Sequence, residues 1–537
     1  MMRRFLAGLF LFFMVSALWQ CAKRGSPTGG PKDEAPPILL RSDPDNMTVN
    51  FKTNKIKLYF DEYVKLENLQ EQLIVSPPLK YLPEITPQGG TGKVVEVTIK
   101  DTLKENTTYT FNFGQSIVDN NEGNPYPFLT YVFSTGDFID SLTLNGVVKD
   151  ALNKKADDFI SVMLYEIDSM YTDSTVFQRP PNYITNTLDS AIIFKISNIK
   201  EGRYALFALK DEAKNNVFDQ NTDKIGFVED TISIPTDSTY LLNLFREIPD
   251  YNLSVPSFAA SNKIIFGYYG DGKEVKIEPM SALPDTVRTK VLRERDKDTL
   301  NFWFTPFETD SILFTVTNEA YQRIDTFNVK TRKVAIDSLV LNPNFRGTYN
   351  FNDSFHIAAN IPLTSIDSTQ IQVIDKDSIP VPFQVDLDSI ENKVDFDFEV
   401  EPNQTYNIEL LPGAITDFFE GTNDSLLYSL STKSPADYAN LTVNLEGAVT
   451  YPLILQLTNE QGETQIEQYA EQPRAFQFNN IEPGIYIVRV IFDTNQNRKW
   501  DTGNFLQRLQ PEKVSYYPKP IELRANWEMI ETFTLIE

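Results

Sequence analysis

The sequence predicts an all-β protein made of tandem antiparallel β-sandwiches. Short runs with one apolar face at period two recur along the chain, for example at residues 56–60, 95–99, 109–113 and 302–304. Turn-forming residues separate these runs about every ten positions, and the 32 prolines suit tight turns rather than helices. With 41% hydrophobic residues in 537, the chain can bury several cores, which predicts roughly three to five domains.

The first 20 residues have the pattern of a secretory signal peptide. A basic start at Arg3 and Arg4 precedes about fifteen apolar residues, too few to span a bilayer, and the only cysteine, Cys21, follows. This placement resembles that of the lipidated cysteine of bacterial lipoproteins, where diacylglycerol on the thiol anchors the mature chain. Leu18 fits that pattern, whereas Gln20 is bulkier than the usual residue. The alternative is an ordinary signal peptide followed by an incidental cysteine.

Residues 21–37 are rich in Gly and Pro and are predicted to form an extended tether between the anchor and the first sandwich. A chain held in this way is expected to contact the membrane through its lipid rather than to span it. Ala22 replaces the aspartate associated with inner-membrane retention, and no acidic cluster of the surface-display kind follows Cys21. These two observations favour the periplasmic face of the outer membrane over the cell surface.

Composition limits the chemistry that the chain can perform. The formal net charge of -25 disfavours nucleic acid as a partner, because phosphate binding needs a basic footprint. The single histidine, His356, cannot supply a multi-histidine zinc site, and a lipidated Cys21 leaves no thiol for a disulfide, a zinc site or a nucleophile. We therefore expect no enzyme activity. Composition does not exclude a pair of catalytic carboxylates like that of a glycosidase. No such pair stands out among the 74 acidic residues.

Two distant parts of the chain repeat one pattern. The segments 106–111, 117–119 and 131–135 recur as 403–408, 415–417 and 428–432. Asp119 precedes Gly123 by the same four positions by which Asp417 precedes Gly421. This spacing predicts a turn capped by the aspartate side chain, with a glycine that supplies conformational freedom.

A second repeat follows each copy of the first. Residues 194–206 correspond to residues 476–488, and both run into loops rich in Asp and Asn, at 211–223 and 493–501. The chain is therefore predicted to hold two copies of a module pair with an extra β segment between them. The predicted domains are 38–137, 140–250, 251–335, 336–434 and 438–537.

Residues 36–137 resemble the SbsA-type bacterial Ig-like domain. The resemblance lies in IKLYFDE at 56–62, VSP at 75–77, NTTY at 106–109 and FST at 133–135. Residues 336–434 resemble this domain more loosely, 251–335 is predicted to be a further Ig-like sandwich, and the lead-in 21–33 is similar to that of Bacteroidota lipoproteins. Segments 140–250 and 438–537 resemble transthyretin-like or carboxypeptidase-regulatory sandwiches through a shared Asn-Ile-x-x-Gly-x-Tyr pattern. These resemblances imply sandwich folds and a place in the cell envelope, and they imply no activity.

The acidic loops are the candidate cation sites. Oxygen-bearing side chains at alternate positions suit a structural calcium ion at Asp493, Asn495, Asn497 and Asp501, and a weaker version of the pattern occurs at Asp219, Asn221 and Asp223. Arg498 and Lys224 stand where a calcium loop usually has glycine, and Asn504 and Asp230 where it usually closes on glutamate. The alternative is that these residues only cap turns.

Several function classes are compatible with these features. The favoured hypothesis is a non-catalytic cell-envelope lipoprotein that acts as a scaffold or as an interaction subunit for other envelope proteins. The alternative is a polysaccharide- or calcium-dependent adhesive binder, for which Trp500, Trp527, Tyr516 and Tyr517 could stack on sugar rings. Such rings more often pack in cores, because they bury large apolar areas. An enzyme is the third class.

Overall fold

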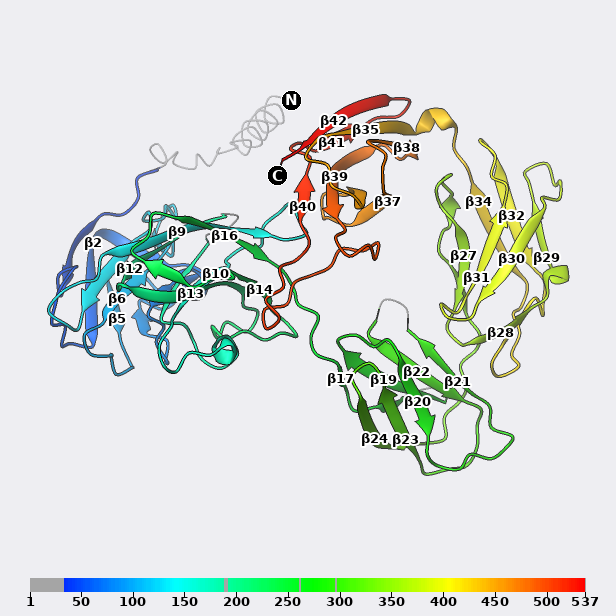
Figure 1. Cartoon of the computed structure of the whole chain (residues 1–537), viewed down its shortest axis with the longest axis horizontal. Coiled ribbons are helices and arrows are strands. Elements are labelled where there is room, and N and C mark those ends of the chain that lie inside the picture. Colours follow the sequence, from blue (N-terminus) through cyan, green and yellow to red (C-terminus); the bar gives the residue numbers. More distant parts are fainter. Residues whose placement is uncertain (1–32, 188–191, 260–261, 295–296, 537) are drawn as a thin grey trace, which may run out of the picture. The chain divides into compact units, whose positions relative to one another are not determined.

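The computed structural model describes residues 33–187, 192–259, 262–294 and 297–536. The predicted signal peptide, Cys21 and the tether as far as residue 32 lie outside these residues. Strands make up nearly all the regular structure (Figure 1), and the helical pieces are short: α2 (Leu69–Gln72), η1 (Asp173–Phe177), η2 (Ser368–Gln370) and η3 (Pro435–Asp437). The prediction of an all-β protein of tandem sandwiches is confirmed. Within the described ranges, no helix combines the length and apolar character needed to cross a membrane.

The chain divides into two compact units, Met1–Ser141 and Leu142–Glu537. The first unit holds one sandwich. Its larger sheet has the order β1 (Leu39–Asp43), β2 (Lys55–Leu66), β5 (Gly92–Thr98), β4 (Glu84–Thr86), with β7 (Ile117–Asp119) also paired to β2. Its smaller sheet has the order β3 (Ile74–Ser76), β6 (Thr108–Asn112), β8 (Thr130–Ser134). Phe133 lies at the centre of the core, with its ring 3.8 Å from that of Phe51.

The second unit begins and ends with sandwiches of one topology, which we name the early module (residues 142–250) and the late module (residues 438–537). The early module has the sheets β11 (Tyr183–Asn186), β10 (Ser161–Glu166), β13 (Gly202–Lys210), β14 (Lys224–Phe227), with β15 (Ile232–Ile234) on β13, and β12 (Ile193–Ile199), β9 (Leu142–Asp150), β16 (Thr239–Leu244). The late module has β37 (Thr464–Ala470), β36 (Leu453–Thr458), β39 (Gly484–Phe492), β40 (Val514–Tyr516), with β41 (Ile521–Leu523) on β39, and β38 (Ala475–Ile481), β35 (Ala439–Gly447), β42 (Glu528–Leu535). In each module the last strand pairs in parallel with the first.

Two further sandwiches lie between these modules in the chain. One has the sheets β17 (Asn252–Leu253), β19 (Lys263–Tyr269), β22 (Thr299–Phe304), β21 (Thr289–Arg293), with β18 (Ser257–Ala259) on β19, and β20 (Val275–Pro279), β23 (Ser311–Asn318), β24 (Arg323–Lys330). The other has β25 (Leu341–Pro343), β27 (Phe355–Ala359), β31 (Lys393–Phe398), β30 (Phe383–Asp388), then β26 (Gly347–Thr348), β34 (Leu426–Ser431), β32 (Thr405–Leu410), β29 (Ile371–Ile374), and the pair β28 (Leu363–Ile366) and β33 (Ile415–Asp417). His356 lies buried in β27.

The repeated aspartate turn forms in both copies. The carboxylate of Asp119 accepts hydrogen bonds from the backbone N–H groups of Glu122, Gly123 and Asn124 at 2.7, 3.1 and 2.8 Å. Asp417 accepts from the N–H of Gly421 at 2.8 Å, as the sequence spacing predicts.

The glycines of the two turns act differently. Gly123 has a φ of 81°, whereas in the second copy the positive φ of 69° belongs to Glu420, one residue earlier than expected. A Cβ on Gly421 would lie 2.6 Å from Oδ2 of Asp417, so this glycine gives room to the carboxylate rather than conformational freedom.

We predict that Asp119→Asn destabilises the first sandwich at neutral pH by about 1–3 kcal/mol, because three backbone donors of the turn lose a charged, buried acceptor. Burial raises the pKa of Asp119, but its backbone hydrogen bonds lower it further, so the pKa lies below the usual value. The charged form therefore stabilises the fold above the unfolded pKa, and this contribution is lost as the pH falls through the folded pKa. The difference in urea unfolding between the two proteins should therefore begin to shrink only below about pH 4 and vanish below the folded pKa. Equal destabilisation by Asp137→Asn, at an exposed position, would contradict this role.

Candidate functional site at a module junction

The central strands of the large sheets of both modules are buried on both faces. In β10, Val162 and Leu164 belong to the core of the early module, and Met163 and Tyr165, which point to the opposite face, are also 0% exposed. All six residues of β36 in the late module are buried. Because alternate residues of a strand point to opposite faces, another part of the chain must cover the outer face of each sheet.

The outer faces differ in chemistry although they occupy matching places in the two modules. Across the large sheet of the early module, residues directly opposite one another form an apolar row of Ile184, Met163, Phe207 and Phe227. Across the large sheet of the late module, the matching row is polar and consists of Glu467, Gln456, Arg489 and Tyr516. Each row is covered by a loop of the other module.

Phe505 of the late module covers the apolar row. It lies in the loop that follows β39, is 0% exposed, and places its ring centroid 5.0 Å from that of Phe207 and 5.3 Å from that of Phe227. Both contacts are edge-to-face, the favoured arrangement for aromatic pairs. Phe177 adds a third ring at 6.4 Å. The late module therefore contributes a side chain to an aromatic cluster of the early module.

Hydrogen bonds hold this loop on the early module. The backbone N–H of Phe505 donates to Oε1 of Glu247 at 2.5 Å, and Gln220 donates to the other oxygen of Glu247 at 2.8 Å. Burial raises the pKa of Glu247, and these two hydrogen bonds oppose that effect. Thr502 donates to the carbonyl of Arg246 at 2.6 Å. A Cβ on Gly503 would lie 2.6 Å from the ring of Phe245, so the loop approaches too closely for a side chain there.

The turn after β9 covers the polar row. The carbonyl of Leu152 accepts a hydrogen bond from Arg489 at 3.1 Å and another from the hydroxyl of Tyr516. Burial raises the pKa of this hydroxyl to about 12, so Tyr516 is a neutral donor at physiological pH. Asp150 shapes the turn by accepting from the N–H groups of Leu152 and Asn153 at 2.9 and 2.6 Å. Both modules thus place a loop on the other's sheet.

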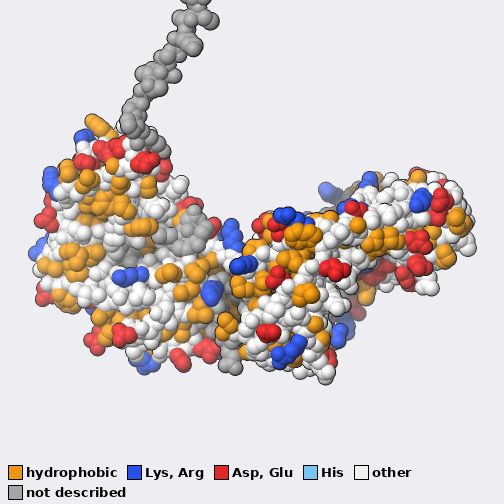
Figure 2. Space-filling model, turned by 90° about the horizontal axis from the view of Figure 1, so that it is seen from above, with side chains coloured by type: hydrophobic (Ala, Val, Ile, Leu, Met, Phe, Trp, Pro, Cys, Tyr) orange, Lys and Arg blue, Asp and Glu red, His pale blue; other side chains and the backbone are white. Residues whose placement is uncertain are grey.

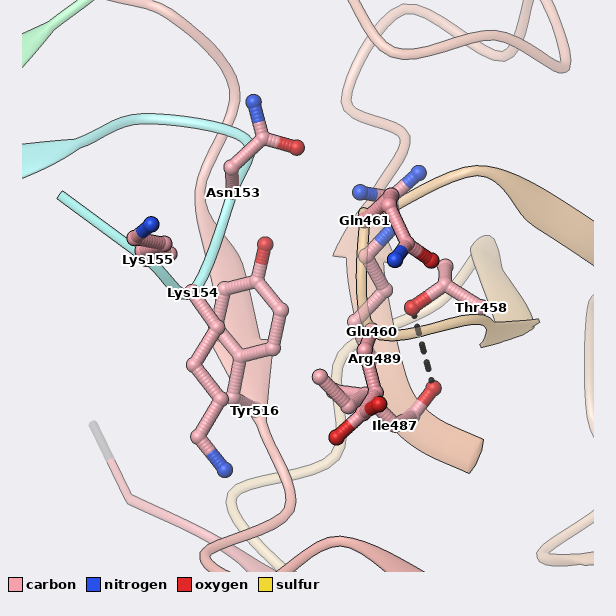
Figure 3. A pocket seen from close by; sticks show the side chains of 10 residues that line it. Asn153, Lys154, Lys155, Thr458, Glu460, Gln461, Ile487, Arg489 and Tyr516 are labelled. Carbon is pink, nitrogen blue, oxygen red and sulfur yellow. Dashed lines mark hydrogen bonds between the residues drawn. The ribbon is translucent and has the colours of Figure 1, made fainter. Parts of the chain in front are cut away.

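A pocket of about 200 Å³ lies beside this contact. Figure 3 shows Asn153 and Tyr516 on one side of it and Gln461 and Arg489 on the other. Gly462 permits the close approach of the two modules, because a Cβ there would lie 2.7 Å from Oδ1 of Asn153. A wider groove of about 760 Å³ adjoins the pocket and shares Asn153 and Tyr516 with it.

The predicted calcium loop of the late module is closed by its own hydrogen bonds. Asp493 is 0% exposed and accepts from the N–H groups of Asn497 and Arg498 at 3.1 and 2.8 Å. The amides of Asn495 and Asn497 both donate to Oδ2 of Asp501, at 2.6 and 2.7 Å. In the part of the chain that the structure describes, no group of three or more His, Cys, Asp or Glu side chains is arranged to hold a metal ion. Calcium binding here stays a prediction.

In the early module, the loop that corresponds to residues 493–501 contains only the first residue of the predicted cation set at Asp219, Asn221 and Asp223. Asn216 donates to Oδ2 of Asp211 at 2.6 Å, as Arg498 does to Asp493, and both donors have positive φ, 57° and 63°. The counterpart of residues 493–501 is therefore 211–219.

The predicted weaker set lies one turn further along. Asp219 accepts from the N–H of Asn221 at 2.9 Å, and the buried Asp223 accepts from the N–H of Asp219 at 2.8 Å. These carboxylates cap turns, and a cation at this set also stays a prediction.

The C-terminal aromatic residues are mostly held inward. The indole of Trp500 donates to the carbonyl of Glu512 at 3.1 Å, Tyr517 donates to Glu531 at 2.5 Å, and Tyr516 lies in the junction. Trp527 is 44% exposed. These positions do not favour a flat stacking platform for sugars, and glycan binding stays a prediction.

The junction was not predicted from the sequence, although the sequence carries a signal for it. The runs VMLY at 162–165 and LILQL at 453–457 are nearly continuous in apolar character, which is typical of strands buried on both faces. The residues that cover these faces, Phe505 and Leu152, lie in loops, where no sequence pattern indicates that they are buried against another module.

Comparison with known protein families supports the Ig-like prediction for the first sandwich. Residues 33–135 match the family described as a bacterial Ig-like domain, which bears out the Ig-like part of the resemblance. A search of curated proteins finds no match.

A search of solved structures finds proteins of low sequence identity to this chain. They include the surface layer protein SbsC, domains 1–6 (12% identity, 91% of this chain and 67% of that chain, TM-score 0.16) and the major pilin subunit BcpA of Bacillus cereus (8%, 74% and 99%, TM-score 0.14). A three-Ig structure of titin has 12% identity over 53% of this chain and 98% of that chain, with a TM-score of 0.12. Likenesses of this size carry no argument about activity.

We predict that Phe505→Ala weakens the junction by about 3–5 kcal/mol, because it empties a buried aromatic site. Limited proteolysis should then cut the loop between β39 and β40 faster than in the native protein, and thermal unfolding should begin at a lower temperature. Leu506→Ala is the matched control, since Leu506 is the next residue and is 54% exposed. Equal effects of the two substitutions would show that Phe505 does not hold the modules together.

Proposed function

We propose that the protein is a non-catalytic lipoprotein of the cell envelope whose sandwiches act as a scaffold or interaction subunit for other envelope proteins. The observation that carries this proposal is the junction between the early and late modules. Two sandwiches, residues 251–434, separate these modules in the chain, yet each module packs a loop against a sheet of the other. Such a contact restrains both ends of the intervening pair, as a presenting framework requires.

Contacts between successive sandwiches support the same role. Trp303 of the 251–335 sandwich packs with Ile361 and Phe418 of the following sandwich, and Arg288 donates to the carbonyl of Phe418 at 2.9 Å. Large apolar side chains at domain borders restrict hinge motion, because separating them would expose apolar surface to water. These borders favour a stiff string of domains over freely jointed ones.

The place in the envelope rests on the chain's first residues and on its first domain. The signal-peptide pattern ends at Cys21, and the sandwich that follows matches a bacterial Ig-like domain. On the face drawn in Figure 2, acidic, basic and hydrophobic side chains are interspersed. This mixture suits contacts with proteins better than with nucleic acid, which needs a basic stripe. We also propose that the early and late modules are transthyretin-like sandwiches.

The anchor is tested by metabolic labelling with palmitate. The native protein should incorporate the label and sediment with membranes, and Cys21→Ala should lose both properties, because no other cysteine exists in the chain. Ser26→Ala, in the predicted tether, is the control and should keep both. An unlabelled native protein would overturn the lipoprotein assignment.

The scaffold role is tested by purifying the tagged lipoprotein from its own membranes after chemical cross-linking. Envelope proteins should be recovered with the native chain and with Leu506→Ala, and in smaller amounts with Phe505→Ala. Hydrolysis of a glycan by the purified protein would instead support the enzyme class.

A further inference from the structure

The late module buries a positive charge that no carboxylate balances directly. Arg489 is 4% exposed, and its guanidinium donates to three neutral oxygens: Gln456 at 2.6 Å, Leu152 at 3.1 Å and Thr464 at 3.2 Å. Among the residues that the structure describes, no aspartate or glutamate lies within the 4.0 Å of an ion pair with it. A buried unpaired charge is costly, whereas a bound anion offsets that cost.

Two carboxylates in the neighbourhood of Arg489, Glu467 and Asp150, have other partners. Glu467 reaches it only through Gln456, whose amide nitrogen donates to Glu467 at 2.5 Å. Asp150 pairs with Lys224 at 2.7 Å and caps the turn that carries Leu152. Glu460 lines the same pocket as Arg489 but forms no ion pair with it within 4.0 Å, so the guanidinium is open to an anion that enters from outside.

Arg489 lines the 200 Å³ pocket at the junction, and two further cations share that lining. Lys154 and Lys155 come from the early module, and Asn153 and Gln461 add amide donors (Figure 3). The ammonium of Lys154 donates to the carbonyls of Tyr517 and Pro518 at 3.0 and 2.9 Å, whereas that of Lys155 is exposed and takes part in no ion pair with a described residue. Cationic residues of both modules thus line one small pocket.

We propose that this pocket binds the carboxylate of a small ligand, no larger than one sugar ring or amino acid. The planar fork of the buried guanidinium matches a carboxylate. Glu460, an exposed residue of the same lining, disfavours a doubly charged group such as phosphate. The ligand would contact both modules at once, so its binding and the junction would stabilise each other.

The test uses full-length protein in detergent and isothermal titration calorimetry at constant ionic strength, with sodium D-glucuronate, sodium acetate, D-glucose and inorganic phosphate as probes. Glucuronate and acetate should bind saturably on the order of 10 mM or tighter, and glucose should not bind. Tighter binding of phosphate than of glucuronate would overturn the carboxylate assignment. Absence of saturable binding by both carboxylates would overturn the site itself.

Two lysine variants test whether the ligand binds in this pocket. Lys155→Glu should weaken glucuronate binding about fivefold, by charge reversal at the rim. Lys499→Glu, on an exposed lysine of the late module outside the pocket, should leave the affinity within twofold of native. Arg489→Gln should abolish binding, but it also removes a junction contact, so the lysine pair decides the outcome. Equal losses with both lysine variants would show that the anion binds elsewhere.

Discussion

The exchange of loops between the early and late modules is the constraint on which the second unit depends. A β-sandwich needs to bury only the inner faces of its sheets, and an outer face can remain in water. Here the outer faces of β10 and β36 are also dry, because Phe505 covers one and the turn at Leu152 covers the other. The contact joins parts of the chain that are far apart in sequence, and it converts two independent sandwiches into one packed body.

The two halves of this junction use opposite chemistry on one framework. Phe207 in the early module and Arg489 in the late module occupy the same position of matching strands, yet one faces an aromatic side chain and the other a backbone carbonyl. The apolar half supplies most of the stabilisation, since burial of aromatic rings is favourable without precise geometry. The polar half supplies orientation, because hydrogen bonds to one carbonyl oxygen tolerate little displacement. The carboxylate pocket that we propose arises at the polar half, where a charge is buried without a counter-ion.

The Asp-rich loops show why residue type alone does not define a cation site. Alternate oxygens at Asp493, Asn495 and Asn497 suit a cation, but the same side chains also satisfy the donors of the loop itself. In the early module the same backbone path occurs at 211–219, where position 213 is alanine. The two loops thus share a backbone conformation although their oxygen-bearing side chains differ. This is expected if backbone hydrogen bonds to Asp211 and Asp493 shape the loop.

The sequence by itself determined the fold class, the two-fold repeat of modules and the aspartate-capped turns, because strand periodicity and turn chemistry are local properties that neighbouring residues reveal. Only the tertiary structure decided which strands are buried on both faces, that Gly421 makes room for a carboxylate, and that Arg489 meets Leu152 across a module border. The module border depends on pairs of residues separated by hundreds of positions, and the contact between Gly421 and Asp417 depends on the conformation of their turn. Nothing local to Phe505, a single phenylalanine in a polar loop, indicates the surface that it covers.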